Sequence, residues 1–232
     1  MHVIRHWHSF VEIMSDEGSI LIDPFITGNT RCDITLDDVK KKNILAVCIT
    51  HGHGDHIGDT MAIVGGTTIP VVCEYGVANY FQDVENYEHC VYGAIGWTVN
   101  VGDNIMVKFF AATHGGGIMK TTMYCCPAGL LITYQGKKVY HAGDTSLMLD
   151  MQQLAKYKID VACVPIDGLY NMDMEDAATA VTYIKPTIVF PIHFDTRPKI
   201  RVESIDFARR VMADGVAVPK VLTPGQYIAL ED

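Results

Sequence analysis

Four side chains that can bind a metal ion lie within six residues of one another, directly after an apolar run over residues 44–50. Imidazole and carboxylate groups are ligands of Zn²⁺ and similar divalent ions, and one tetrahedral ion needs fewer of them from a single loop. Two adjacent ions would explain why this one loop offers more ligands than a single ion needs. Glycines at alternate positions would let the backbone turn tightly around the ligands. The segment therefore predicts a metal site that uses His51, His53, Asp55 and His56.

Three further metal-capable side chains follow other apolar runs, at the points where buried strands are expected to end. Taken singly, each is equally explained as a capped strand end or a hydrogen-bonded core histidine. Ligand sites in open α/β sheets gather at the carboxyl ends of strands, so we expect these positions to converge on the first motif. The three positions are His114, Asp144 and His193.

The runs that precede these side chains predict mainly hairpins in the first part of the chain. The continuous apolar run over 44–50 is typical of a strand buried on both faces. One apolar stretch over 3–14, a turn over 15–18 and a strand over 19–23 predict an opening hairpin. Further predicted elements are a helix that begins at Thr35, a strand over 69–73, a helix over 75–81, and antiparallel pairs of 97–101 with 105–112 and of 130–134 with 138–141.

The last third of the chain predicts alternating helices and strands. Helices are expected near 146–157, 174–184 and 203–213, and strands over 159–164, 187–191 and 218–222. Early hairpins followed by βαβ units predict an α/β (α+β) fold, with a mixed sheet or a pair of sheets covered by helices on the outer faces. We find no linker composition, so residues 1–232 are expected to form one domain.

The order and spacing of these motifs resemble the metallo-β-lactamase-fold hydrolases over essentially the whole chain. The segments Trp7-His8-Ser9, Leu21-Ile22-Asp23-Pro24-Phe25 and the motif from His51 to Thr60 are similar to a branch of small metal-dependent hydrolases that includes relatives of L-ascorbate-6-phosphate lactonase. This resemblance implies an αββα sandwich of two mixed sheets. It also implies that His51, His53 and His114 hold one metal, that Asp55, His56 and His193 hold a second, and that Asp144 bridges the two.

Two adjacent divalent ions predict a hydrolase in which a metal-bound hydroxide attacks a carbonyl or phosphoryl centre. The resemblance implies that Asp55 also acts as the proton acceptor. Zinc is the first expectation, and Mn, Fe or Ni also suit imidazole and carboxylate ligands. We expect a small, anionic ester or lactone as substrate, with a phosphodiester as the alternative. A non-catalytic metal-binding member of the fold is the alternative from another class.

Composition limits the partners. The chain has 18 Lys and Arg against 27 Asp and Glu, a formal net charge of −9 and an isoelectric point near 5.5. This acidity disfavours nucleic-acid binding. No apolar run approaches the ~20 residues of a membrane span. Seven cysteines without a C-x-x-C pair predict reduced thiols and a cytoplasmic protein. The apolar fraction of 49% leaves room for a homo-oligomeric contact beside the small-molecule substrate.

Four other residues near the motifs are considered for a role at the site or in supporting it. His8 is interpreted as a hydrogen-bonded strand histidine, with the site mouth as the alternative. His141 is expected to be structural, and Asp23 to hydrogen-bond a ligand histidine. Asp167 follows a predicted strand and is expected to line the cleft, whereas His6 and His89 carry no functional signal.

Overall fold

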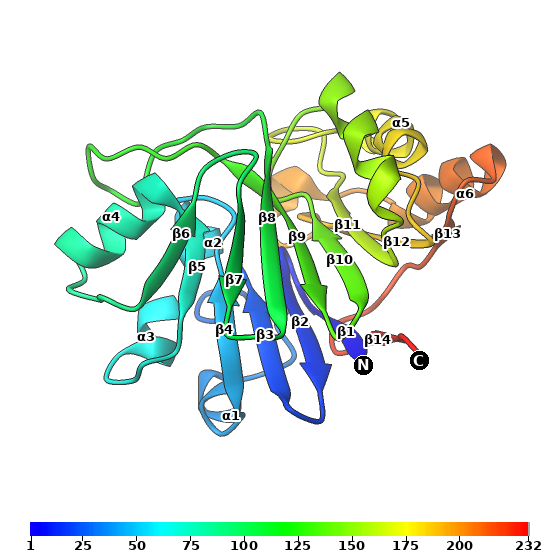
Figure 1. Cartoon of the computed structure of the whole chain (residues 1–232). Coiled ribbons are helices and arrows are strands. Elements are labelled where there is room, and N and C mark those ends of the chain that lie inside the picture. The colour runs from blue at the N-terminus through cyan, green and yellow to red at the C-terminus, as the bar shows by residue number, and fades with distance from the viewer. Residues whose placement is uncertain (232) are drawn as a thin grey trace.

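The chain folds into two mixed sheets of seven strands each (Figure 1), and the computed structural model describes residues 1–231. The first sheet has the order β14-β1-β2-β3-β4-β5-β6, and the second has the order β13-β12-β11-β10-β9-β8-β7. The first sheet comprises β1 (His2–Trp7), β2 (Phe10–Ser15), β3 (Gly18–Ile22), β4 (Ile44–Cys48), β5 (Val71–Glu74), β6 (Cys90–Gly93) and β14 (Tyr227–Ala229). The second comprises β7 (Thr98–Val101), β8 (Ile105–Ala111), β9 (Ala128–Tyr134), β10 (Lys137–His141), β11 (Val161–Pro165), β12 (Ile188–Ile192) and β13 (Val218–Pro219).

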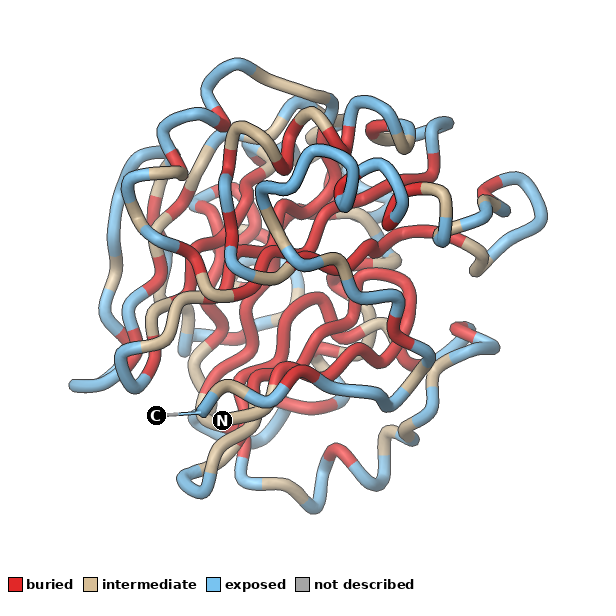
Figure 2. The backbone as a smooth tube through the Cα atoms, turned by 90° about the vertical axis from the view of Figure 1, so that its right-hand side faces the viewer, coloured by how far each residue is buried: buried red, intermediate tan, exposed pale blue. Residues whose placement is uncertain are grey.

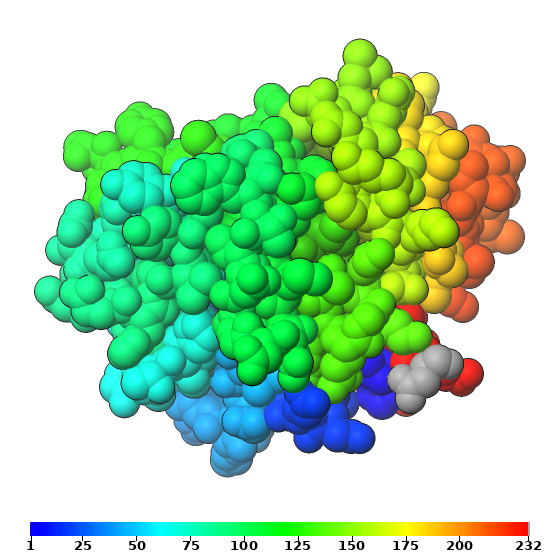
Figure 3. All heavy atoms as spheres, viewed as in Figure 1, coloured from blue at the N-terminus to red at the C-terminus, as the bar shows by residue number. Residues whose placement is uncertain are grey.

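Each sheet starts with antiparallel strands and continues with parallel ones. In the first sheet β1, β2 and β3 are antiparallel neighbours, and β3 to β6 are parallel. In the second, β7 to β10 are antiparallel and β10 to β13 are parallel. The first and last strands of the described chain, β1 and β14, pair with each other at the lower right of Figure 3. Green segments around β7 to β10 cover the face shown there.

The main core lies between the sheets, and alternate residues of single strands serve different layers. In β11, Val161 and Cys163 face the core between the sheets, whereas Ala162 and Val164 pack under the helices of the second sheet. This double burial explains the continuous apolar runs. Buried backbone accordingly fills the interior in Figure 2, while the exposed segments lie at the periphery.

Helices cover both outer faces. On the first sheet lie α1 (Leu36–Lys40), α3 (Thr60–Val64) and α4 (Tyr75–Asp83), with α2 (Gly54–Ile57) in the loop after β4. On the second lie η1 (Leu149–Tyr157), α5 (Met174–Ile184) and α6 (Ser204–Asp214), with η2 (Pro198–Ile200) between β12 and α6. The expected αββα sandwich is therefore confirmed.

Three predicted elements were wrong in detail. The stretch over 3–14 is two strands, because Trp7 and His8 adopt positive φ angles of 91° and 54° and turn the chain. Both side chains are buried, so the apolar pattern did not reveal this turn. The helix near 146–157 is a 3-10 helix confined to Leu149–Tyr157, and the last strand of the second sheet shortens to Val218–Pro219. Within residues 1–231, none of the helices has the length and apolar character of a membrane span.

Candidate metal centre

The predicted ligand positions meet at one end of the sandwich. Strands β8, β10 and β12 run in the same direction, because β9 is antiparallel to both β8 and β10 and because β10, β11 and β12 are parallel. The loops after them present His114, Asp144 and His193 at one edge of the second sheet. The loop after β4 brings the remaining four residues from the first sheet, with Asp55 and His56 on the single turn α2.

Three of these histidines form a first group. Nε2 of His51 lies 3.0 Å from Nδ1 of His53, and Nε2 of His114 lies 3.3 Å from the same atom. Their ligand atoms all lie within 4.8 Å of one another. Only one of the two glycines of the motif is required by its surroundings: a Cβ on Gly52 would lie 2.6 Å from Ile118, whereas one on Gly54 would make an ordinary contact of 3.7 Å with Sδ of Met119.

Asp144 lies between this group and a second one. Its Oδ2 is 3.1 Å from Nε2 of His193 and 3.5 Å from Nε2 of His114, and its Oδ1 is 3.3 Å from Nε2 of His56. The strand exit that holds Asp144 requires Gly143, which has a φ of 63° and whose Cβ would lie 2.9 Å from Thr50. The carboxylate therefore faces histidines from both sheets.

Several atoms of this cluster are buried without a hydrogen-bond partner in the described part of the chain. They are Nε2 of His8, Nε2 of His56 and Oδ1 of Asp144. A buried polar atom without a partner costs about 1–3 kcal/mol. All three can donate a lone pair, and imidazole nitrogen and carboxylate oxygen are ligands of divalent ions. The residues therefore fit a metal ion.

Carboxylates behind the cluster fix two of the imidazoles. Oδ2 of Asp23 lies 2.7 Å from Nδ1 of His56, and Oδ1 accepts from the backbone N–H of Thr50. Oδ2 of Asp167 lies 2.9 Å from Nδ1 of His193. Such contacts orient metal-binding histidines and raise their basicity. The expected contact of Asp23 is confirmed, whereas the part that Asp167 plays in holding His193 was missed.

The comparisons with known proteins agree with this chemistry. A family model described as "Beta-lactamase superfamily domain" matches residues 19–194. A "UPF0173 metal-dependent hydrolase" of Geobacillus sp. (strain WCH70) is 40% identical, over 99% of this chain and 100% of that protein. This chain is a member of the UPF0173 metal-dependent hydrolase family, in the metallo-β-lactamase superfamily. It is therefore a metal-dependent hydrolase.

Solved structures agree with the fold of this UPF0173 hydrolase. Igni18, described as a novel metallo hydrolase from the archaeon Ignicoccus hospitalis, is 32% identical with a TM-score of 0.89, and the match covers 100% of this chain and 98% of that one. An isothiocyanate hydrolase from Delia radicum gut bacteria has a TM-score of 0.75 at 14% identity, over 99% of both chains. The latter likeness shows the fold alone.

The electrostatics of the UPF0173 site favour a bound cation. Burial raises the pKa of Asp144, but His193 and His56 outweigh it and hold this pKa well below its usual range. Burial lowers the pKa of His193, whereas Asp144 and Asp167 raise it to about 9. Burial and, to a smaller extent, His193 together lower the pKa of His8 to about 4. The site therefore combines ionised carboxylates with imidazoles that either hold a proton or offer a free lone pair.

Two adjoining cavities give access to the site of this UPF0173 hydrolase. One of about 260 Å³ is lined by His8, His114, Asp144 and His193, and one of about 740 Å³ has a mainly apolar wall. Both are bordered by His53, Asp55 and Arg197. The Arg197 guanidinium is 3.5 Å from Oδ2 of Asp55. Sequence reasoning missed Arg197, because no motif marks the loop that holds it.

Asp55 is the carboxylate that borders both cavities. Its side chain is 21% exposed, so it is accessible from the cleft. Burial raises the pKa of Asp55, but His8 and the other imidazoles nearby outweigh it and hold the pKa well below its ordinary value. The carboxylate is therefore ionised at neutral pH.

Two other histidines differ in how they match their predictions. His141 is structural, as expected: its Nε2 lies 2.8 Å from the carbonyl oxygen of Ser9, and its Nδ1 accepts from the N–H of Gly143. The interpretation of His8 as a strand histidine was wrong, because it lies in the turn between β1 and β2 and its side chain borders the smaller cavity. The alternative, that His8 reaches the site, is the one the geometry supports.

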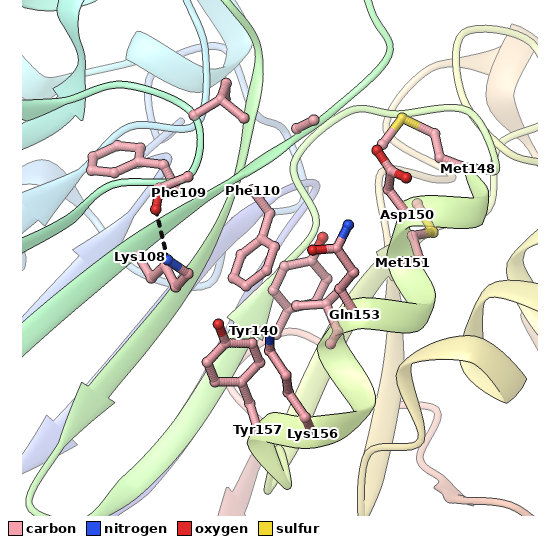
Figure 4. Close-up of a pocket in the computed structure, with 14 residues that line it drawn as sticks. Lys108, Phe109, Phe110, Tyr140, Met148, Asp150, Met151, Gln153, Lys156 and Tyr157 are labelled. Atoms are coloured by element: carbon pink, nitrogen blue, oxygen red, sulfur yellow. Dashed lines mark hydrogen bonds between the residues drawn. The ribbon is translucent and has the colours of Figure 1, made fainter.

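A separate cavity of about 280 Å³ lies on the outer face of the second sheet, between β8 and η1 (Figure 4). Phe110 stacks edge-on against Tyr140 and Tyr157 there. Lys108 donates to the carbonyl oxygen of Gly96 at its rim. Of the described residues that line it, none is a predicted ligand, so this cavity is distinct from the metal centre.

Proposed function

We propose that this enzyme hydrolyses a small anionic ester or lactone at a pair of divalent ions, with zinc as the first choice. His51, His53 and His114 would hold one ion, and Asp55, His56 and His193 the other, with Asp144 shared between them. The close approach of the ligand atoms supports this assignment for the five histidines and Asp144. Asp55 approaches the second group at His8, whose Nε2 lies 3.4 Å from its Oδ2. Such ions polarise the scissile group and make water nucleophilic at neutral pH.

The residues of the chain would divide the remaining tasks. Asp55 would accept a proton at its carboxylate, since it is ionised and borders both cavities. Asp23 and Asp167 would keep His56 and His193 in place through their Nδ1 atoms. Positioned groups of this kind lower the barrier because no reorganisation is needed during the reaction.

The observation that supports the substrate class is the composition of the larger cavity. Arg197 and Lys120 place two cationic side chains around it in an otherwise acidic protein, next to the metal-binding end. Its other wall is formed by apolar and aromatic side chains, namely Phe25, Tyr80, Val84 and Met119. We infer an anionic group bound near Arg197 and a short apolar portion against this wall. The resemblance to relatives of the ascorbate-phosphate lactonase favours a lactone among such esters.

A substrate panel tests the proposal. The chain is loaded with Zn²⁺ or Mn²⁺ and assayed on neutral and anionic p-nitrophenyl esters, on lactones and on bis-p-nitrophenyl phosphate. We expect turnover of an anionic ester or lactone, and its loss in a variant that combines His51→Ala and His53→Ala. Turnover of the phosphodiester alone would replace the ester proposal with the phosphodiesterase alternative.

A further inference from the structure

His8 is held in an unusual backbone conformation at the metal-binding end. It lies in the turn between β1 and β2 with a φ of 54°, after Trp7 with a φ of 91°. Non-glycine residues in this region cost of order 1–3 kcal/mol and persist where the surroundings enforce them. Here the carbonyl oxygen of His8 accepts from the N–H of His193, at 3.1 Å. The turn is therefore tied to a residue of the metal centre.

Thr196 engages one ring nitrogen of His8, Nδ1, and leaves Nε2 on the side of Asp55. Oγ1 of Thr196 lies 2.8 Å from Nδ1 of His8 and 3.5 Å from the carbonyl oxygen of Phe194. A hydroxyl can accept from Nδ1–H of His8 while its own hydrogen is directed toward that carbonyl oxygen. In this tautomer of the neutral imidazole, Nε2 has no hydrogen and offers its lone pair.

That lone pair faces other lone-pair donors. Nε2 of His8 is buried, has no hydrogen-bond partner within residues 1–231, and lies 3.4 Å from Oδ2 of Asp55. Two acceptors at this distance repel unless a positive charge lies near both. The ligand atoms of His8, His56 and His193 lie within 4.8 Å of one another.

The three rings share one arrangement. Each has its Nδ1 against a side-chain oxygen behind the site, supplied by Thr196, Asp23 and Asp167 respectively. In a typical metal-binding histidine, one ring nitrogen is hydrogen-bonded to an oxygen behind the site, and the other ring nitrogen points toward the metal. The arrangement of His8 is thus the same as that of the two histidines already proposed for the second ion.

We propose that His8 is a further ligand of the second metal ion, through Nε2, beside His56 and His193. This rests on the two-ion site of the proposed function. A third imidazole makes the second site richer in nitrogen, which favours Zn, Fe or Ni over Mn. It also gives the turn after β1 a reason to keep its strained backbone.

The role of His8 is tested by measuring metal binding, with no assay of turnover. The metal-free full chain is titrated with Zn²⁺ against a chromophoric chelator, and bound zinc is counted by mass spectrometry after gel filtration. We expect two ions in the parent chain, and for His8→Phe one tight ion with the second weakened at least about tenfold. The matched control is His89→Phe, at an exposed histidine, which should bind as the parent does.

A second pair of variants tests the same role without depending on whether His8→Phe folds. Thr196→Val keeps His8 but removes the oxygen on its Nδ1, so the second zinc should weaken by about 10–100-fold. Thr196→Ser keeps the hydroxyl and should restore binding. Two equally tight ions in Thr196→Val and in a folded His8→Phe would overturn the role of His8 and leave the proposed function intact. Fewer than two ions in the parent chain would instead overturn the two-ion site itself.

Discussion

Oδ1 of Asp144 lies 3.3 Å from Nε2 of His56, and both atoms are buried without a hydrogen-bond partner in the described chain. On its other side the His56 ring meets Oδ2 of Asp23 at 2.7 Å. Burial lowers the pKa of His56, but Asp144 and Asp23 outweigh it and raise this pKa well above its ordinary value. The pair therefore favours a positive charge between its atoms, which a proton supplies in the metal-free protein and a metal ion in the loaded one.

Metal removal is expected to lower the thermal stability of the protein. An ion that binds only the folded state stabilises it by about 2.7 kcal/mol per site at a free concentration of 100 times its Kd. In a chain of this size that corresponds to a Tm shift of roughly 5–10 °C. Melting followed by circular dichroism, with EDTA and then with excess Zn²⁺, measures this shift. An unchanged Tm would contradict a metal ion at the Asp144–His56 pair.

Replacement of Asp167 is expected to weaken metal binding more than it weakens the fold. In Asp167→Asn the amide N–H₂ replaces one of the two oxygens, which between them accept from Leu169, Tyr170 and Asn171 and hold His193. Loss of such an outer contact typically costs 10–100-fold in metal affinity. Competition with a chromophoric chelator measures this metal affinity directly. Asp160→Asn, at the opposite end of β11 from Asp167, alters a carboxylate that accepts from the backbone N–H of Lys138 and should leave the affinity unchanged.

The sequence was sufficient to predict the architecture and the meeting of seven side chains, because each of those residues follows an apolar strand. It was not sufficient for His8, Asp167 and Arg197. His8 occupies a turn whose residues are all buried, so hydrophobic periodicity runs through it unbroken. Asp167 acquires its partner, His193, from the loop after the neighbouring strand β12, 26 residues away. Their roles depend on contacts between distant segments, which local patterns do not encode.

Removal of the Arg197 guanidinium is expected to affect substrate binding selectively. This side chain is 60% exposed and borders both cavities, so Arg197→Ala should leave the fold intact. A hydrogen bond to a charged group contributes about 1.5–3 kcal/mol, which corresponds to a rise in KM of roughly 10–100-fold for an anionic ester. A neutral ester of the same size should show little change. Arg210→Ala on α6, where Arg210 is also exposed, is the control.

A buried ion network away from the site gives the fold its own pH dependence. Glu12 on β2 is buried, and its carboxylate lies 2.8 Å from Nε2 of His6 and accepts from Lys42 at 2.6 Å and from Ser19 at 2.5 Å. Burial raises the pKa of Glu12, but the hydrogen bonds of His6, Lys42 and Ser19 outweigh it and lower the pKa to about 2. Burial also lowers the pKa of His6, whereas its contacts with Asp33 and Glu12 raise it overall.

Glu12→Gln is therefore expected to flatten the acid branch of the stability curve. Because the pKa of Glu12 is lower in the folded state, its stabilisation is complete above its ordinary value of 4.5 and is lost as the pH falls through about 2. The loss amounts to about 3 kcal/mol. His6 acts in the opposite direction: its stabilisation is complete below pH 6.5 and is lost as the pH rises through its raised pKa. Urea unfolding between pH 7 and pH 2 should show parent and variant converging at the acid end, while the exposed control Glu88→Gln follows the parent throughout. A constant difference between parent and Glu12→Gln across this range would mean that the charge of Glu12 does not stabilise the fold.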